Sequence, residues 1–78
     1  MSDKPANYFL DASDLLCPLP VLKARKKLAT MASGSVLDLQ ATDPMSAIDM
    51  PHFCMEQGHE LLSYTATPTH HLFRIRRK

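Results

Sequence analysis

The residue best suited to chemistry in this chain is Cys17, which stands directly before the run Pro18-Leu19-Pro20. Proline is well tolerated in the first turn of a helix, so a helix is predicted to begin near Pro18. Cys17 would then be its N-cap, where the free N–H groups of Leu19 and Val21 and the positive end of the helix dipole converge. Such a position lowers a thiol pKa and favours a reactive nucleophile. The alternative is a buried structural cysteine, because free cysteines are often buried.

The surroundings of Cys17 limit the reactions that it could carry out. No general base stands near it in the sequence, and no Ser/His/Asp order suggests a hydrolase. A chain of 78 residues forms one small domain with a thin core, which leaves little room for a deep active site. A thiolate without a base or an oxyanion hole suits exchange at sulfur, such as the gain and release of a persulfide sulfur. We therefore expect chemistry at the surface and no cofactor.

The second thiol, Cys54, lies in an apolar segment beside Phe53 and Met55. A packed thiol is one interpretation, and a resolving or auxiliary thiol is the other. Two cysteines are too few for the disulfide framework of a small secreted domain, so free thiols in a cytoplasmic protein are expected. His52, Cys54 and His59 lack the four-ligand pattern of a zinc site, so no metal site is predicted.

Basic residues gather in two clusters, although the net charge is only +1. The first contains Lys23, Arg25, Lys26 and Lys27, and the second contains Arg74, Arg76, Arg77 and Lys78. Each cluster is either a solvated face or an electropositive surface for docking a protein partner. Arg25 lies at the edge of the apolar helix face, where it could pair with an acid or contact that partner. Direct RNA binding is not expected, because Phe73 is the only aromatic residue near the second cluster.

The spacing of apolar residues predicts the elements that must position these side chains. Residues 1–7 are expected to be a flexible tail, and residues 8–78 a single domain. Strands are predicted at 8–10, 35–41, 59–67 and 71–76, with residues 11–14 as a turn. Helices are predicted at 18–31 and 44–57, the second kinked or divided at Pro51.

This βαβαββ order predicts the fold class. Two amphipathic helices must bury their apolar faces, and one four-stranded mixed sheet is enough to cover both. An α/β (α+β) two-layer sandwich follows, with both helices on one face of the sheet. No run approaches the roughly 18 apolar residues of a membrane span, so no membrane association is expected.

The stretch Cys17-Pro18-Leu19-Pro20, continued by Val21-Leu22-Lys23-Ala24-Arg25-Lys26, resembles the CPxP signature of the TusA family. Asp43-Pro44, Ile48-Asp49-Met50-Pro51-His52-Phe53-Cys54 and Gly58-His59-Glu60-Leu61 are similar to the rest of its pattern. Many members have Gly-Leu-Arg before the cysteine, where this chain has Asp14-Leu15-Leu16. Aspartate tolerates left-handed backbone better than most residues, so we expect the turn to survive.

The resemblance implies a βαβαββ sandwich that carries sulfur. Members take sulfur from a cysteine desulfurase or a rhodanese-type donor onto the CPxP cysteine, here Cys17, and pass it to an acceptor protein. The acceptor pathway is commonly 2-thiouridine synthesis in tRNA, while some members serve molybdenum-cofactor maturation or sulfur oxidation. We expect the free protein to be a monomer. Whether it is an enzyme or only a carrier stays open. The alternative is a regulatory or protein-binding module of the same fold, in which Cys17 transfers no sulfur.

Overall fold

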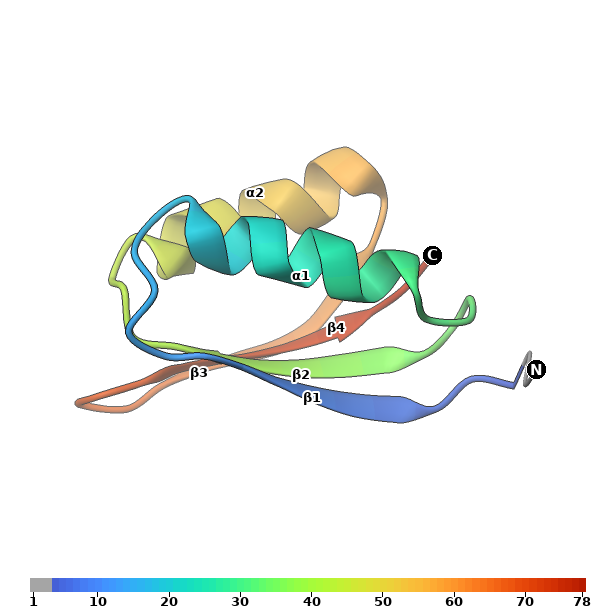
Figure 1. Ribbon diagram of the computed structural model, residues 1–78, viewed down its shortest axis with the longest axis horizontal. Helices are drawn as coiled ribbons and strands as arrows, with labels where there is room; N and C mark the ends of the chain where they lie inside the picture. Colours follow the sequence, from blue (N-terminus) through green and yellow to red (C-terminus); the bar gives the residue numbers. More distant parts are fainter. Residues whose placement is uncertain (1–3) are drawn as a thin grey trace.

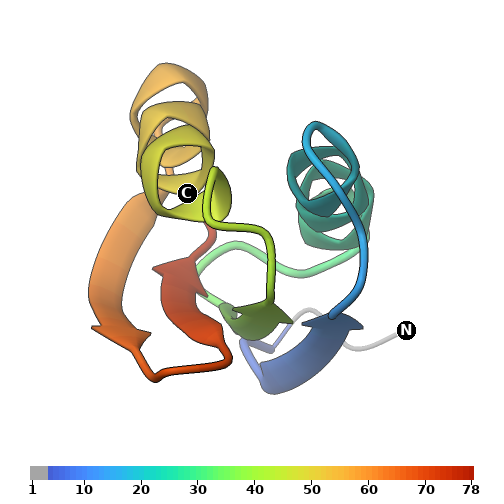
Figure 2. The ribbon, with the colours of Figure 1, turned by 90° about the vertical axis from the view of Figure 1, so that its left-hand side faces the viewer.

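The computed structural model describes residues 4–78 and confirms the predicted βαβαββ order (Figure 1). Its elements are β1 (Asn7–Ala12), α1 (Leu19–Ala29), β2 (Val36–Ala41), α2 (Ser46–Gln57), β3 (Glu60–Ala66) and β4 (His71–Arg76). Figure 2 shows both helices on one face of the sheet, with α1 above β1 and β2 and α2 above β3 and β4. The predicted two-layer sandwich is therefore confirmed.

The sheet places the two helix-entry loops side by side. Its strand order is β1-β2-β4-β3, with β1 parallel to β2 and the other pairs antiparallel, so the predicted mixed sheet is confirmed. The last residues of β1 and β2, Ala12 and Ala41, are register partners. Because parallel strands end at the same edge of a sheet, the loops that lead into α1 and α2 emerge together, at the left of Figure 1.

The core lies between the helices and the sheet. Alternate residues of β2 and β4 point into it, as the sequence pattern predicts: Leu37, Leu39, Ala41, Phe73 and Ile75 are buried. From the helices the core receives Ala24, Leu28, Met50, Phe53 and Cys54. Full burial of one such large apolar side chain contributes about 1.5–3 kcal/mol, so this layer holds both helices in place.

Several predicted boundaries differ from the structure. Residues 1–3 of the predicted tail lie outside the described residues, while Asn7, also assigned to that tail, is the first residue of β1. Asp11 and Ala12, predicted in a turn, extend β1, because each pairs with a residue of β2. The first turn of α2 begins at Ser46 and the helix continues through Pro51 without a division, with Met50 and Phe53 packed in the core on either side.

One negative finding concerns membranes. Over residues 4–78, neither helix has the length and apolar character that crossing a bilayer requires.

Candidate functional site

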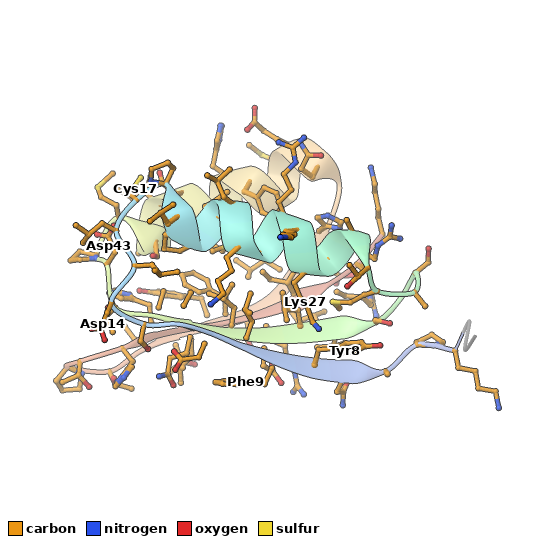
Figure 3. All side chains as sticks on the ribbon, viewed as in Figure 1. Tyr8, Phe9, Asp14, Cys17, Lys27 and Asp43 are labelled. Atoms are coloured by element: carbon orange, nitrogen blue, oxygen red, sulfur yellow. The ribbon has the colours of Figure 1, made fainter. Side chains whose placement is uncertain are left out.

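Cys17 lies exposed in the loop between β1 and α1, at the end of the molecule where both helices begin (Figure 3). It precedes Pro18, the N-cap of α1, so the prediction that Cys17 is the N-cap is wrong by one residue. The Leu19 N–H, predicted to face the sulfur, donates instead to the Leu16 carbonyl at 2.8 Å. The Cys17–Pro18 peptide bond is cis. Because the Leu19 N–H is bonded to the Leu16 carbonyl, it is not the free donor beside the thiol that the sequence predicted.

Two hydrogen bonds fix the loop of Cys17 to the loop that follows β2. Asp14 has a φ of 65°, which confirms the left-handed turn, and its N–H donates to Thr42 Oγ1 at 2.8 Å. The Cys17 N–H donates to Asp43 Oδ2 at 2.5 Å. The other oxygen of Asp43 accepts from the Met45 N–H at 3.1 Å. The Asp43 carboxylate, only 9% exposed as a residue, therefore joins the Cys17 loop to the entry of α2.

The Cys17 sulfur contacts a second carboxylate. Its thiol donates to Asp49 Oδ2, with Sγ and Oδ2 2.7 Å apart. This hydrogen bond, slight burial and the negative charges of Asp49 and Asp43 together raise the pKa of Cys17 above its ordinary value. The predicted lowering of this pKa is therefore wrong. The physical reason is that a thiolate here would be repelled by two carboxylates and would lose its hydrogen bond to Asp49.

A groove of about 360 Å³ leads from Cys17 along the seam between the two helices. Its residues are Cys17, Pro18, Val21, Leu22, Arg25, Asp49, His52, Phe53, Glu56 and Gln57. The middle of the groove is apolar, and His52 and Glu56 pair at 3.2 Å on its α2 side. The exposed thiol thus lies at one end of an open groove rather than in an enclosed pocket.

The basic cluster of α1 is divided between two roles. Lys23 Nζ donates to the Asp11 carbonyl at 3.1 Å, and Lys27 Nζ lies 4.8 Å from the centre of the Tyr8 ring (Figure 3). Both side chains therefore tie α1 to β1. Arg25 is exposed, lines the groove and forms no ion pair within residues 4–78, so the predicted pairing with an acid is not found. Lys26 is also exposed.

The supporting residues of the motif differ in exposure. Pro20 is fully buried and packs the start of α1 against the core, whereas Leu19 is 49% exposed. Cys54 is 2% exposed, which confirms the packed-thiol interpretation, and burial raises its pKa to about 11. Within residues 4–78, no group of three or more His, Cys, Asp and Glu side chains is arranged to hold a metal ion.

Sequence reasoning did not place Asp43 or Asp49 at the site of Cys17. They lie 26 and 32 residues after Cys17, and no local spacing rule connects residues so far apart. The available signal was their position within the two stretches that resemble the family pattern, Asp43-Pro44 and the segment around Pro51.

Comparison of the sequence with known proteins finds relatives that are described as sulfur carriers. A family model described as "Sulfurtransferase TusA" matches residues 8–77. The "Sulfur carrier protein TusA" of Pseudomonas entomophila is 41% identical over 78 residues, which cover 100% of this chain and 98% of that protein. The protein of the same description from Allochromatium vinosum is 53% identical over 53 residues, 68% of this chain and 70% of its own length.

A solved structure shows the same fold. The crystal structure of a SirA-like protein from Desulfitobacterium hafniense superposes with a TM-score of 0.77. It is 22% identical in sequence, and the match covers 88% of this chain and 95% of that one. The family match begins at the second residue of β1 and includes the other five elements and the complete CPxP motif. The chain therefore belongs to the TusA family of sulfur carrier proteins.

Proposed function

We propose that Cys17 is the residue on which this carrier holds sulfur, as a persulfide received from a donor protein and passed to an acceptor protein. The observation that carries the proposal is the exposure of Cys17 as a free thiol at the open end of the interhelix groove. Transfer of sulfane sulfur needs an accessible thiol that two successive partners can reach, and little other machinery.

The anchoring of the loop supports this role. Asp43 holds the backbone of Cys17 and Thr42 holds that of Asp14, so the thiol is presented from a fixed position. A fixed thiol reduces the entropy that a partner must remove to bring two sulfur atoms together. The exposed position also lets the carrier leave after transfer, because no enclosing pocket retains the sulfur.

The donor and acceptor are proposed by class. A cysteine desulfurase or a rhodanese-type protein is the proposed donor, and the proposed acceptor acts in tRNA 2-thiouridine synthesis. Arg25 and Lys26 are the proposed docking residues, because both are exposed and Arg25 lines the thiol groove, whereas Lys23 and Lys27 contact β1. Charges of this kind raise association rates and select partners. We place the relay in the cytoplasm, where two unpaired thiols stay reduced.

A protein-binding module without sulfur transfer is the second candidate. The observation that favours it is the sheet face opposite the helices, where a hollow of about 440 Å³ lies beside Phe9, which is 63% exposed. Full function of a Cys17→Ala protein in cells would support this candidate. Direct RNA binding has less support, because Arg74 pairs with Asp38 at 3.2 Å and Arg76 pairs with Glu60.

The test is a sulfur-loading experiment. The protein is incubated with a pyridoxal-phosphate cysteine desulfurase and L-cysteine, or with a rhodanese and thiosulfate, and its intact mass is taken without reductant. We expect a gain of one sulfur that reductant removes, retained in Cys54→Ala and absent in Cys17→Ala. A gain that depends on Cys54, or no gain from either donor class, would contradict the proposal.

A further inference from the structure

The contact between Cys17 and Asp49 suggests a role for a residue outside the CPxP motif. Asp49 lies in the first turn of α2, and its Oδ2 is 2.7 Å from the Cys17 sulfur. We propose that Asp49 is a catalytic residue of the relay, which takes the thiol proton when Cys17 accepts sulfur and gives Cys17 a proton when the sulfur leaves. This inference rests on the proposed persulfide chemistry of Cys17.

The charged groups around the thiol make such an acceptor necessary. Asp49 faces Cys17 from α2 and Asp43 faces it from the loop before α2, and both raise its pKa. Arg25 on α1 and the His52–Glu56 pair on α2 line the same groove. At neutral pH Cys17 is therefore a neutral thiol, although attack at sulfur requires the thiolate. The proton has to leave as the new bond forms, and the Asp49 carboxylate already accepts it in a hydrogen bond.

The loading step balances without any further reactant. The Cys17 sulfur attacks the outer sulfur of the donor persulfide while its proton passes to Asp49. A new S–S bond forms on Cys17, the S–S bond of the donor breaks, and the donor cysteine leaves with the electron pair. That thiolate takes the proton from Asp49, so a persulfide and a thiol give a thiol and a persulfide with no net oxidation.

Unloading is the same step in reverse, as microscopic reversibility requires. An acceptor thiol passes its proton to Asp49 as its sulfur attacks the outer sulfur on Cys17, and the Cys17 sulfur is now the leaving group. A thiol with a raised pKa is a poor leaving group as a thiolate, because a basic sulfur departs slowly. A proton from Asp49 makes its departure easier. The same carboxylate therefore serves both directions, which a carrier needs and a one-way enzyme does not.

Between transfers, the arrangement also protects the empty carrier. Because the thiolate is the form that alkylating and oxidising agents attack, a thiol held neutral by Asp49 reacts slowly with both. When a donor docks, its sulfane sulfur contacts a Cys17 thiol that is already hydrogen-bonded to a proton acceptor, Asp49. Asp49 thus separates productive transfer from unwanted side reactions.

Asp49→Asn separates this role from a simple electrostatic effect, because the two measurable rates should move in opposite directions. Removing the charge lowers the pKa of Cys17, so alkylation by iodoacetamide at pH 7 should become several-fold faster. Loading from glutathione persulfide, a donor without a docking surface, should become about ten- to a thousandfold slower. Loss of general acid–base catalysis slows a step by about 10²–10⁴-fold, and the several-fold gain in thiolate offsets part of that loss. Circular dichroism and a melting curve would confirm that the variant is folded.

Two further variants complete the test. Asp49→Glu keeps a carboxylate and should restore part of the loading rate. Asp38→Asn removes an exposed carboxylate on the sheet and should change neither rate. Loading that becomes faster in Asp49→Asn together with alkylation, or an unchanged pair of rates, would overturn the inference while leaving Cys17 as the carrier. Failure of the wild-type protein to gain sulfur from any donor would overturn the proposed function as well.

Discussion

The two cysteines of this protein have the same chemistry and opposite surroundings. Both are free thiols whose pKa is raised. For Cys17, which is exposed, the main cause is the hydrogen bond to Asp49 together with the charges of Asp49 and Asp43. For Cys54, which is 2% exposed in α2, the cause is burial, which raises its pKa to about 11.

The difference shows that a raised pKa alone does not describe the reactivity of a thiol. The carboxylate that disfavours the Cys17 thiolate is also able to receive the proton, so the reactive form becomes available when a partner docks. Burial offers Cys54 no such acceptor, and its thiolate becomes accessible only when the core opens. Exposure and a proton acceptor, more than the pKa, distinguish Cys17, the proposed carrier thiol, from the buried Cys54.

The largest expected effect is in thiol labelling. With excess iodoacetamide at pH 7 to 8, Cys17 should react directly because its thiol is exposed. Cys54 should react only in molecules whose core has opened. For a stability of at least about 5 kcal/mol, that opening reduces the rate by about 10³-fold or more. Mass spectrometry of peptides at several time points gives the two rates.

The control for this labelling uses the unfolded protein. In denaturant both thiols should react within the same order of magnitude, because the environments that separate them are lost. Comparable rates in the native protein would mean that the core around Cys54 opens easily, and the contrast between the two cysteines would then be wrong.

The second effect concerns the anchor of the reactive loop. Asp43→Ala removes the acceptor of the Cys17 and Met45 N–H groups, and hydrogen bonds to charged groups contribute about 1.5–3 kcal/mol each. We expect the free energy of unfolding to fall by about 3 kcal/mol and sulfur loading to slow, because the thiol is no longer held in place. Urea denaturation measures the first quantity and a loading time course the second.

Asp43→Asn is the matched variant for this prediction. It keeps one acceptor oxygen, so it should lose less stability than Asp43→Ala. If both variants load sulfur at the wild-type rate, the position of Cys17 does not depend on Asp43.

Much of this fold was predictable because its determinants are local. The alternation in β4 places Phe73 and Ile75 in the core, as expected from the pattern alone. The left-handed turn at Asp14 followed from the tolerance of aspartate for positive φ. The pattern alone did not decide whether Pro51 kinks or divides α2, because the packing of Met50 and Phe53 on either side of Pro51 is a tertiary property.

The electrostatics of the site could not be predicted in the same way. The position of Cys17 before Pro18 suggested a helix terminus that lowers the thiol pKa, and this local argument gave the wrong sign. The deciding residue, Asp49, comes from the other helix and reaches Cys17 because β1 and β2 are parallel and end at one edge of the sheet. The sequence predicts Cys17 as the nucleophile, whereas the pairing of the strands determines the charges beside it.

The third effect is a loss of stability at alkaline pH that belongs to Cys54. Below the ordinary thiol pKa, Cys54 is protonated in both states and contributes no pH dependence. As pH rises above it, the unfolded chain releases this proton while the folded protein keeps it up to a pH of about 11, so stability falls. The loss across this window is about 3 kcal/mol. Urea denaturation at several pH values should show a shallower fall in Cys54→Ala, whereas an equal fall would assign the effect to other groups.

The smallest effect separates the causes of the two raised pKa values by their response to salt. Between about 0.1 M and 1 M salt the Debye length falls from about 10 Å to about 3 Å, which screens charges that are not in contact. The Asp49 oxygen, at 2.7 Å from the sulfur, should keep most of its influence, while that of Asp43 weakens. Alkylation of Cys17 at pH 8 should therefore quicken by less than about twofold. The alkaline loss of stability due to Cys54 should stay the same, because ions do not enter the core. A much larger salt effect on the alkylation of Cys17 would show that its thiol responds mainly to distant charges. The contact with Asp49 would then not be the main cause of its raised pKa.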